Sequence, residues 1–254
     1  MPELYLEVCA GLGNRIRSLI SGICAAEELG LELMLHWYPF DAACACHFES
    51  IFDPDSLPPF VYRAPTMLHG AKECLSVDDW KNIVKGWNGT GDIFIRSYGK
   101  FYGGTQEKEA RWLHHLRALK PTAFIEKQVN QRLANIEVNQ ALGVHIRHGD
   151  NRKAAEASPF YAFIREMLMD KAPYFVVATD DILYKERLQQ HFMERCVFPS
   201  QIIDRASEIG MIEAAIDFFA LAKCPRILGS DWSSFSHIAA LYGGAELTLA
   251  KKDN

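Results

Sequence analysis

Over its second half, the chain alternates short apolar segments with longer amphipathic ones, and few folds accept that alternation. The apolar segments have the length and β-branched content of buried strands. They cover residues 141–147, 174–180, 200–204, 226–230 and 245–250. The segments between them carry apolar residues at helical spacing. Strands that alternate with helices form a parallel, doubly wound sheet, so the sequence predicts an α/β fold for this half.

The beginning of the chain follows the same scheme. A strand leads into a glycine-rich turn, a helix that ends at Gly30, and a second strand. From 38 to 102 the pattern is irregular, with many turn residues. We therefore predict two Rossmann-like domains, 1–136 and 137–254, with a cleft between them. Because 254 residues are few for two such domains, we expect the N-terminal one to be reduced.

Composition narrows the classes of function. A net charge of −5 and an isoelectric point near 6.0 argue against a nucleic-acid-binding protein, which would present a basic surface. The seven cysteines are an odd number, and most lie in apolar stretches. This is typical of reduced thiols. With neither a leader-like segment nor a membrane-length apolar run, the sequence predicts a cytoplasmic protein without a membrane span.

Polar side chains gather where the predicted strands end. The first group is His145, Arg147 and Asp150, and the second is the pair Asp180 and Asp181. The third is a serine-rich helix start at 233–236. In open parallel sheets, ligands bind beyond the carboxyl ends of the strands, so we expect these groups to meet at one site.

The serine-rich helix start has two interpretations. Ser233 or Asp231 could simply cap the helix, which is the commoner role of such residues. Alternatively, the free N–H groups and the positive end of the helix dipole form an anion site. The planar guanidinium of Arg147 suits phosphate oxygens and favours the second interpretation. Together these features predict a pyrophosphate site.

Two nucleotide-binding motifs are incomplete. The segment GLGNRI has two glycines of a dinucleotide fingerprint, but Ile16 stands where the third glycine should be. The segment HGD is similar to a phosphotransferase loop, but Ala155 replaces the asparagine that this loop needs. An oxidoreductase and a kinase are therefore disfavoured.

Two possible metal motifs are also weak. Asp53 and Asp55 flank a proline and precede more turn residues, so we expect a turn rather than a metal–nucleotide site. Cys44, Cys46 and His47 are spaced too tightly for a usual zinc site. We expect no metal and no cofactor.

Four segments together resemble the fucosyltransferase superfamily, whose members use GDP-fucose and have the glycosyltransferase B fold. They are GLGNRI, GVHIRHGD, VVATDD and GSDWSSFSHIAALYGG, and they occur in the family's order across both halves. The resemblance implies an inverting transferase that needs no divalent metal, because an arginine replaces the cation. Its partners would be a nucleotide-sugar donor and a glycan or polysaccharide acceptor.

The resemblance also implies roles for individual residues. Arg147 would bind the β-phosphate and stabilise the leaving nucleotide, with His145 on the same face. The remaining assignments are Ser233, Ser234, Phe235 and Ser236 at the pyrophosphate and fucose, Asp180 or Asp181 at the nucleoside, and Gly13 and Asn14 at the sugar or acceptor.

An acceptor hydroxyl needs a base, and a carboxylate is the usual choice. In some relatives a glutamate follows the arginine motif by about ten residues, and Glu156 stands near that point here. Glu156 could equally be a solvated loop carboxylate. Asp150 and Glu7 are the other candidates.

Three alternatives to fucosyl transfer remain open from the sequence. The donor could carry another sugar, such as a xylosyl or other hexosyl group. The chain could also be a non-catalytic module that binds a nucleotide sugar. A Rossmann oxidoreductase is the third, and the incomplete glycine fingerprint counts against it.

Overall fold

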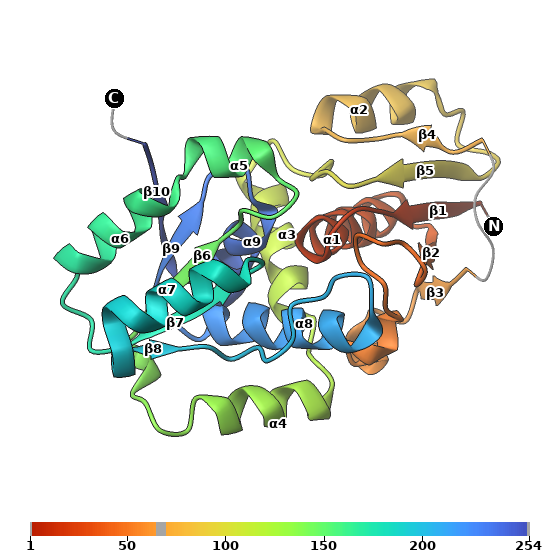
Figure 1. Ribbon diagram of the computed structural model, residues 1–254. Helices are drawn as coiled ribbons and strands as arrows, with labels where there is room; N and C mark the ends of the chain where they lie inside the picture. The colour runs from red at the N-terminus through yellow and green to blue at the C-terminus, as the bar shows by residue number, and fades with distance from the viewer. Residues whose placement is uncertain (1, 65–69, 253–254) are drawn as a thin grey trace. The chain divides into compact units, whose positions relative to one another are not determined.

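The computed structural model describes residues 2–64 and 70–252, which form two compact units, Met1–Thr122 and Ala123–Asn254 (Figure 1). Each unit is built on a five-stranded parallel sheet. The predicted α/β class with parallel sheets is confirmed. Because α4 (Ala123–Arg132) packs against α8 (Glu208–Ala222), the predicted boundary at 136–137 falls inside the second unit. No helix within the described residues is long and apolar enough to cross a membrane.

The N-terminal sheet has the strand order β3-β2-β1-β5-β4. Its strands are β1 (Glu3–Val8), β2 (Glu32–Trp37), β3 (Val61–Arg63), β4 (Lys72–Glu73) and β5 (Ile93–Ser97). The chain moves outward from β1 to β2 and β3, and then adds β4 and β5 on the other side of β1. The strand order therefore reverses between β1 and β5.

The helices of this unit are α1 (Leu12–Leu29), α2 (Val77–Gly86) and α3 (Gln106–Ala118). In α1, apolar residues at helical spacing are buried, and Gly30 ends the helix in the left-handed conformation with φ 65°. Gly22 lies against the sheet so closely that a Cβ there would come within 2.4 Å of Leu6 Cδ2. Helix α1 therefore covers the face of the sheet that carries Leu4, Leu6 and Leu33.

The C-terminal sheet has the order β10-β9-β6-β7-β8. Its strands are β6 (Leu142–Ile146), β7 (Phe175–Thr179), β8 (Cys196–Val197), β9 (Arg226–Ser230) and β10 (Glu246–Ala250). The other helices of the unit are α5 (Arg152–Ala157), α6 (Phe160–Met169), α7 (Ile182–Phe192) and α9 (Ser234–Gly243). Here the strand order reverses between β6 and β9, and open α/β sheets bind ligands at such a switch point.

The predicted strand at 200–204 is wrong, and β8 forms at Cys196–Val197 instead. The backbone explains the difference. The N–H of Ser200 donates to Asp217 Oδ1 at 2.9 Å, and the N–H of Gln201 donates to Glu213 Oε2 at 2.7 Å. Both acceptors are side chains of α8, so these N–H groups bond to a helix rather than to a neighbouring strand.

Asp217 should make the stability of the protein depend on pH. Burial raises the pKa of its carboxyl to about 7 from an ordinary 3.8, against the hydrogen bonds from Ser200. The folded state therefore binds the extra proton between these two values, and Asp217 stabilises it less as the pH rises. We expect the free energy of unfolding to fall, relative to that of Asp217→Asn, by up to about 1.4 kcal/mol per pH unit. Urea denaturation of both proteins across this window measures the difference, and a difference that stays constant with pH would contradict the prediction.

Candidate active site

The switch point of the C-terminal sheet joins the ends of β6 and β9 by a shared serine. The N–H of Arg147 donates to Ser230 Oγ at 2.8 Å, and that hydroxyl donates to the carbonyl of His145 at 3.3 Å. Ser230 is almost fully buried. These bonds fix the backbone of Arg147 at the edge of the sheet, where its side chain can meet a ligand.

The beginning of α9 lies beside this edge. The Phe235 ring stacks on His145 with centroids 4.8 Å apart and an interplanar angle of 22°. Ser233 stands at the N-cap, but its side chain accepts no hydrogen bond from the helix. The first turn of a helix has N–H groups without intrahelical partners, so α9 presents donors here that Ser233 does not satisfy. Ser233 therefore occupies the N-cap position without satisfying these N–H groups, and its contact with a phosphate stays a prediction.

Two further polar atoms in this region are buried without a hydrogen-bond partner among the described residues. They are Ser236 Oγ and His145 Nδ1. Ser236 packs so tightly on β9 that a Cβ at Gly229 would approach its Oγ to 2.6 Å. Buried polar groups are normally satisfied, so unpaired ones at a strand end suit a polar ligand.

His145 acts here as a neutral group. Burial lowers the pKa of its imidazole to about 3, with a smaller effect from the charge of Arg147. The ring therefore carries no charge near neutral pH. It can support Phe235 and offer a hydrogen bond, but it adds no positive charge to the site.

Arg147 lies between two carboxylates. Its guanidinium forms ion pairs with Asp150 and Asp180, and its side chain is 15% exposed. Asp180 Oδ1 also accepts the N–H groups of His148, at 2.8 Å, and Gly149, at 3.2 Å. Asp180 thus holds both Arg147 and the turn that follows it.

The other acidic residues of the site have partners of their own. Asp181 caps α7 by accepting the N–H of Leu183 at 2.8 Å. Asp150 pairs with Arg205, 3.0 Å away, as well as with Arg147. Burial raises the pKa of Asp150, but the hydrogen bond and charge of Arg147 and the charge of Arg205 outweigh it, so the pKa is lowered overall. A carboxylate of lowered pKa is a weak base. Contact of Asp180 or Asp181 with a nucleoside stays a prediction.

Glu156 lies on the surface of α5. Its side chain is 65% exposed, and Oε1 accepts from Arg152 Nε at 2.7 Å one helical turn away. Gly13 and Asn14 lie in the first turn of α1 in the N-terminal unit, where the N–H of Asn14 donates to the Gly11 carbonyl. The roles of all three residues stay predictions.

Two contacts of this site have no signal in the sequence. The hydroxyl of Ser158 accepts the N–H of Asp231 at 2.8 Å. Arg205 reaches Asp150 across 55 positions. Each contact joins segments that are distant in the chain, and only the tertiary fold brings them together.

The weak metal motifs form ordinary local structure. Asp53 accepts the N–H of Asp55 at 3.1 Å and caps a single 3₁₀ turn, so the predicted turn is confirmed. The sulfurs of Cys44 and Cys46 are buried and lie 3.9 Å apart. Within residues 2–64 and 70–252, no three His, Cys, Asp or Glu side chains are grouped so that they could hold a metal ion.

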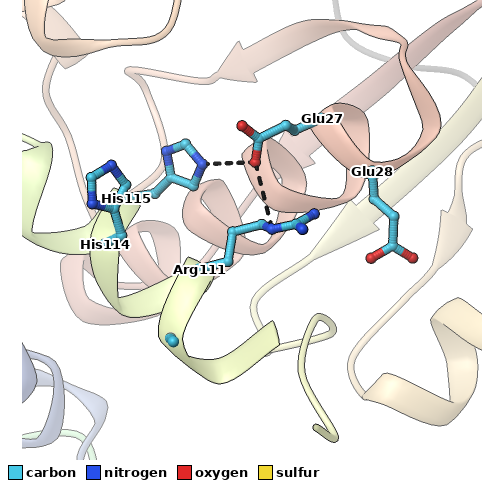
Figure 2. A pocket seen from close by; sticks show the side chains of 6 residues that line it. Glu27, Glu28, Arg111, His114 and His115 are labelled. Atoms are coloured by element: carbon cyan, nitrogen blue, oxygen red, sulfur yellow. Dashed lines mark hydrogen bonds and ion pairs between the residues drawn. The ribbon is translucent and has the colours of Figure 1, made fainter. Parts of the chain in front are cut away.

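A shallow polar pocket lies between α1 and α3 in the N-terminal unit (Figure 2). Figure 2 shows His115 and Arg111 directed at Glu27, whose carboxylate is 3.1 Å from His115 Nε2 and 3.9 Å from Arg111 Nε. Glu28 pairs with Lys108 at 2.8 Å. These charges neutralise one another on an open surface, so we assign no ligand to this pocket.

Solved structures of similar fold include fucosyltransferases. Fucosyltransferase NodZ from Bradyrhizobium has a TM-score of 0.66 at 15% identity, over 94% of this chain and 93% of that one. Arabidopsis thaliana FUT1 in complex with GDP has a TM-score of 0.66 at 13% identity, over 100% and 71%. POFUT1 in complex with GDP-fucose has a TM-score of 0.61 at 10% identity, over 98% of each chain. No family model and no curated protein matches the sequence. The resemblance stated from the sequence is thus confirmed at the level of the fold.

Proposed function

We propose that this protein is a glycosyltransferase that moves fucose from GDP-fucose to a hydroxyl of a glycan, with inversion and without a metal ion. The proposal rests on the end of β6 and the start of α9 at the switch point of the C-terminal sheet. Ser230 accepts the N–H of Arg147 there, and Phe235 in the first turn of α9 stacks on His145. The N-cap of α9 accepts no hydrogen bond from the helix. The solved structures of similar fold include complexes with GDP and with GDP-fucose, which supports that donor.

The site has the donors that cleavage of a nucleotide sugar requires. As the bond between the anomeric carbon and the β-phosphate oxygen breaks, negative charge grows on the diphosphate. Donors that are already fixed at the phosphate stabilise this transition state more than the ground state. Arg147 supplies a charged fork and α9 supplies backbone N–H groups, so neither donor needs a divalent cation.

The second half of the reaction is the attack by the acceptor. The acceptor oxygen forms the new bond to the anomeric carbon from the side opposite to GDP, and its proton passes to a carboxylate. Glu156 is our first candidate for this base, and Glu7 is the alternative. The weak basicity expected of Asp150 beside two arginines makes it the least suitable of the three.

GDP should stabilise the protein without added Mg²⁺ or Mn²⁺, whereas UDP and NAD should not. At a hundred times its Kd, a ligand that binds only the folded state raises the free energy of unfolding by about 2.7 kcal/mol. A thermal-shift series with the three nucleotides measures this, and Arg147→Ala should reduce the GDP effect. Stabilisation by UDP alone would overturn the choice of donor. GDP binding without transfer to any acceptor in a glycan panel would indicate a non-catalytic module.

A further inference from the structure

Three polar side chains form a row at the carboxyl edge of the N-terminal sheet. Glu7 on β1 is the register partner of His36 on β2 and of Arg96 on β5. Register partners on parallel strands direct their side chains to the same face, and the strands are about 4.8 Å apart. The row also spans the β1–β5 pair, where the strand order reverses. This is the position at which an open α/β sheet binds ligands.

Two members of the row, Glu7 and His36, are buried titratable groups that the mechanism above leaves without an established role. Glu7 and His36 are each only 5% exposed. Arg96 forms an ion pair with Glu7, with 3.2 Å between Arg96 Nε and Glu7 Oε1, and more than half of the Arg96 side chain is exposed. The row therefore combines a buried carboxylate with a cation that can still reach a ligand.

His36 has a ring nitrogen, Nε2, that has no hydrogen-bond partner among the described residues. Its Nδ1 lies 3.3 Å from the carbonyl oxygen of Ala64. Because a carbonyl can only accept, the neutral form of the ring carries its hydrogen on Nδ1 and a lone pair on Nε2. Nε2 is buried and has no partner among the described residues. A buried acceptor without a donor destabilises a fold, so this atom suits a ligand that donates a hydrogen bond.

Exposed aromatic rings continue from His36 along the following loop. The Tyr38 ring lies nearly parallel to His36, with centroids 6.2 Å apart, and Phe40 packs on Tyr38 at 5.6 Å. Phe40 is 75% exposed. Arg15 fixes this loop, since it is fully buried and donates to the Tyr38 carbonyl at 2.8 Å and to Asp41 at 3.1 Å. The rings are thus held in place without being buried.

We propose that Glu7, His36 and Arg96, with Tyr38 and Phe40, form a binding site for a pyranose sugar. Hydroxyls of one ring can donate to the Glu7 carboxylate and to His36 Nε2, and accept from Arg96. The electron-rich faces of Tyr38 and Phe40 suit the polarised C–H groups of the same pyranose ring. The buried carboxylate excludes a phosphate as the ligand, and the adjacent arginine disfavours a metal ion. The identification of this sugar with the acceptor of the transfer reaction, and only that step, rests on the proposed function.

Saturation-transfer NMR on the whole chain, without nucleotide, tests the site. The probes are the methyl glycosides of glucose, galactose, mannose and N-acetylglucosamine. We expect saturation transfer to at least one of them and at least tenfold weaker binding in Glu7→Gln and in His36→Phe, which lose an acceptor but keep the shape. Glu3→Gln is the matched control, because Glu3 lies on the same strand and face at its other end. It should bind like the unchanged protein.

Three results would overturn the proposal. The first is the absence of saturation transfer to all four glycosides. The second is that Glu7→Gln and His36→Phe bind the glycosides as well as Glu3→Gln does. The third is that the ¹⁵N shift of His36 Nε2 does not change when a glycoside that binds is added. The last measurement uses the unchanged protein, so it decides the matter even where a variant fails to fold. GDP binding in the same samples separates the two hypotheses. Glycoside binding without GDP binding upholds this site and overturns the donor, whereas the reverse overturns this site alone.

Discussion

Arg147→Ala is expected to lower turnover by about 10²–10³, equivalent to roughly 3–4 kcal/mol of transition-state stabilisation, as for the loss of one oxyanion donor. The reason is that Arg147 follows β6 at the switch point, where Ser230 holds its backbone and its guanidinium is the cation of this strand end. Arg147→Lys should recover little, because an ammonium group cannot reproduce the two-pronged geometry. Turnover with GDP-fucose and a competent acceptor measures the effect.

Melting curves complete this experiment. Arg147 lies at a strand end rather than in the core, and Asp180 keeps its hydrogen bonds to His148 and Gly149 without it, so folding should survive. Arg165→Ala is the matched control, because Arg165 is a surface arginine of the same unit that pairs with Glu166. Near-normal turnover in Arg147→Ala would contradict the mechanism. A large fall in Tm would instead make Arg147 a structural ion-pair residue.

Glu156→Gln is expected to lower turnover by about 10²–10⁴ and leave GDP binding intact, because the variant keeps the shape of the side chain but cannot take a proton. The measurements are turnover at saturating donor and GDP affinity. Glu166→Gln is the control, since Glu166 is also a carboxylate on a helix that pairs with a nearby arginine.

An unchanged rate in Glu156→Gln would return Glu156 to the surface ion pair with Arg152 in which it is found. Glu7→Gln would then be the next variant to measure for loss of turnover. A parallel loss of GDP affinity in Glu156→Gln would show that Glu156 acts through the donor site, which would also contradict its role as the base.

The sequence predicted the polar strand ends well, because the signals are local. An apolar run that ends in charge marks the end of β6, and a serine cluster after another run marks the start of α9. Parallel strands then place such ends at one edge by geometry alone. His145 and Phe235 are in contact because the end of β6 and the start of α9 lie at that same edge.

The ion pairs and hydrogen bonds of the individual residues could not be predicted in the same way, because their partners are distant in the sequence. Asp180, the partner of Arg147 that follows β7, is 33 positions away, and nothing in the motif shows that it also holds the turn at His148. The failed strand at 200–204 depends on two acceptors of α8. His36 has a bare Nε2 because of the Ala64 carbonyl, which only the pairing of β2 with β3 brings near.

The two carboxylates around Arg147 bear on how a product would leave the enzyme. In the absence of a nucleotide, Asp150 and Asp180 neutralise the guanidinium, so a diphosphate must displace them in order to bind. In the proposed reaction, the same carboxylates would compete with GDP for the arginine after the sugar has departed. The carboxylates would then replace the diphosphate on the Arg147 guanidinium as the nucleotide dissociates. The positive charge of the arginine would therefore never be left without a counter-ion. Tight product inhibition is a hazard for any enzyme that binds a diphosphate strongly, and under the proposed function the acidic pair would counteract it.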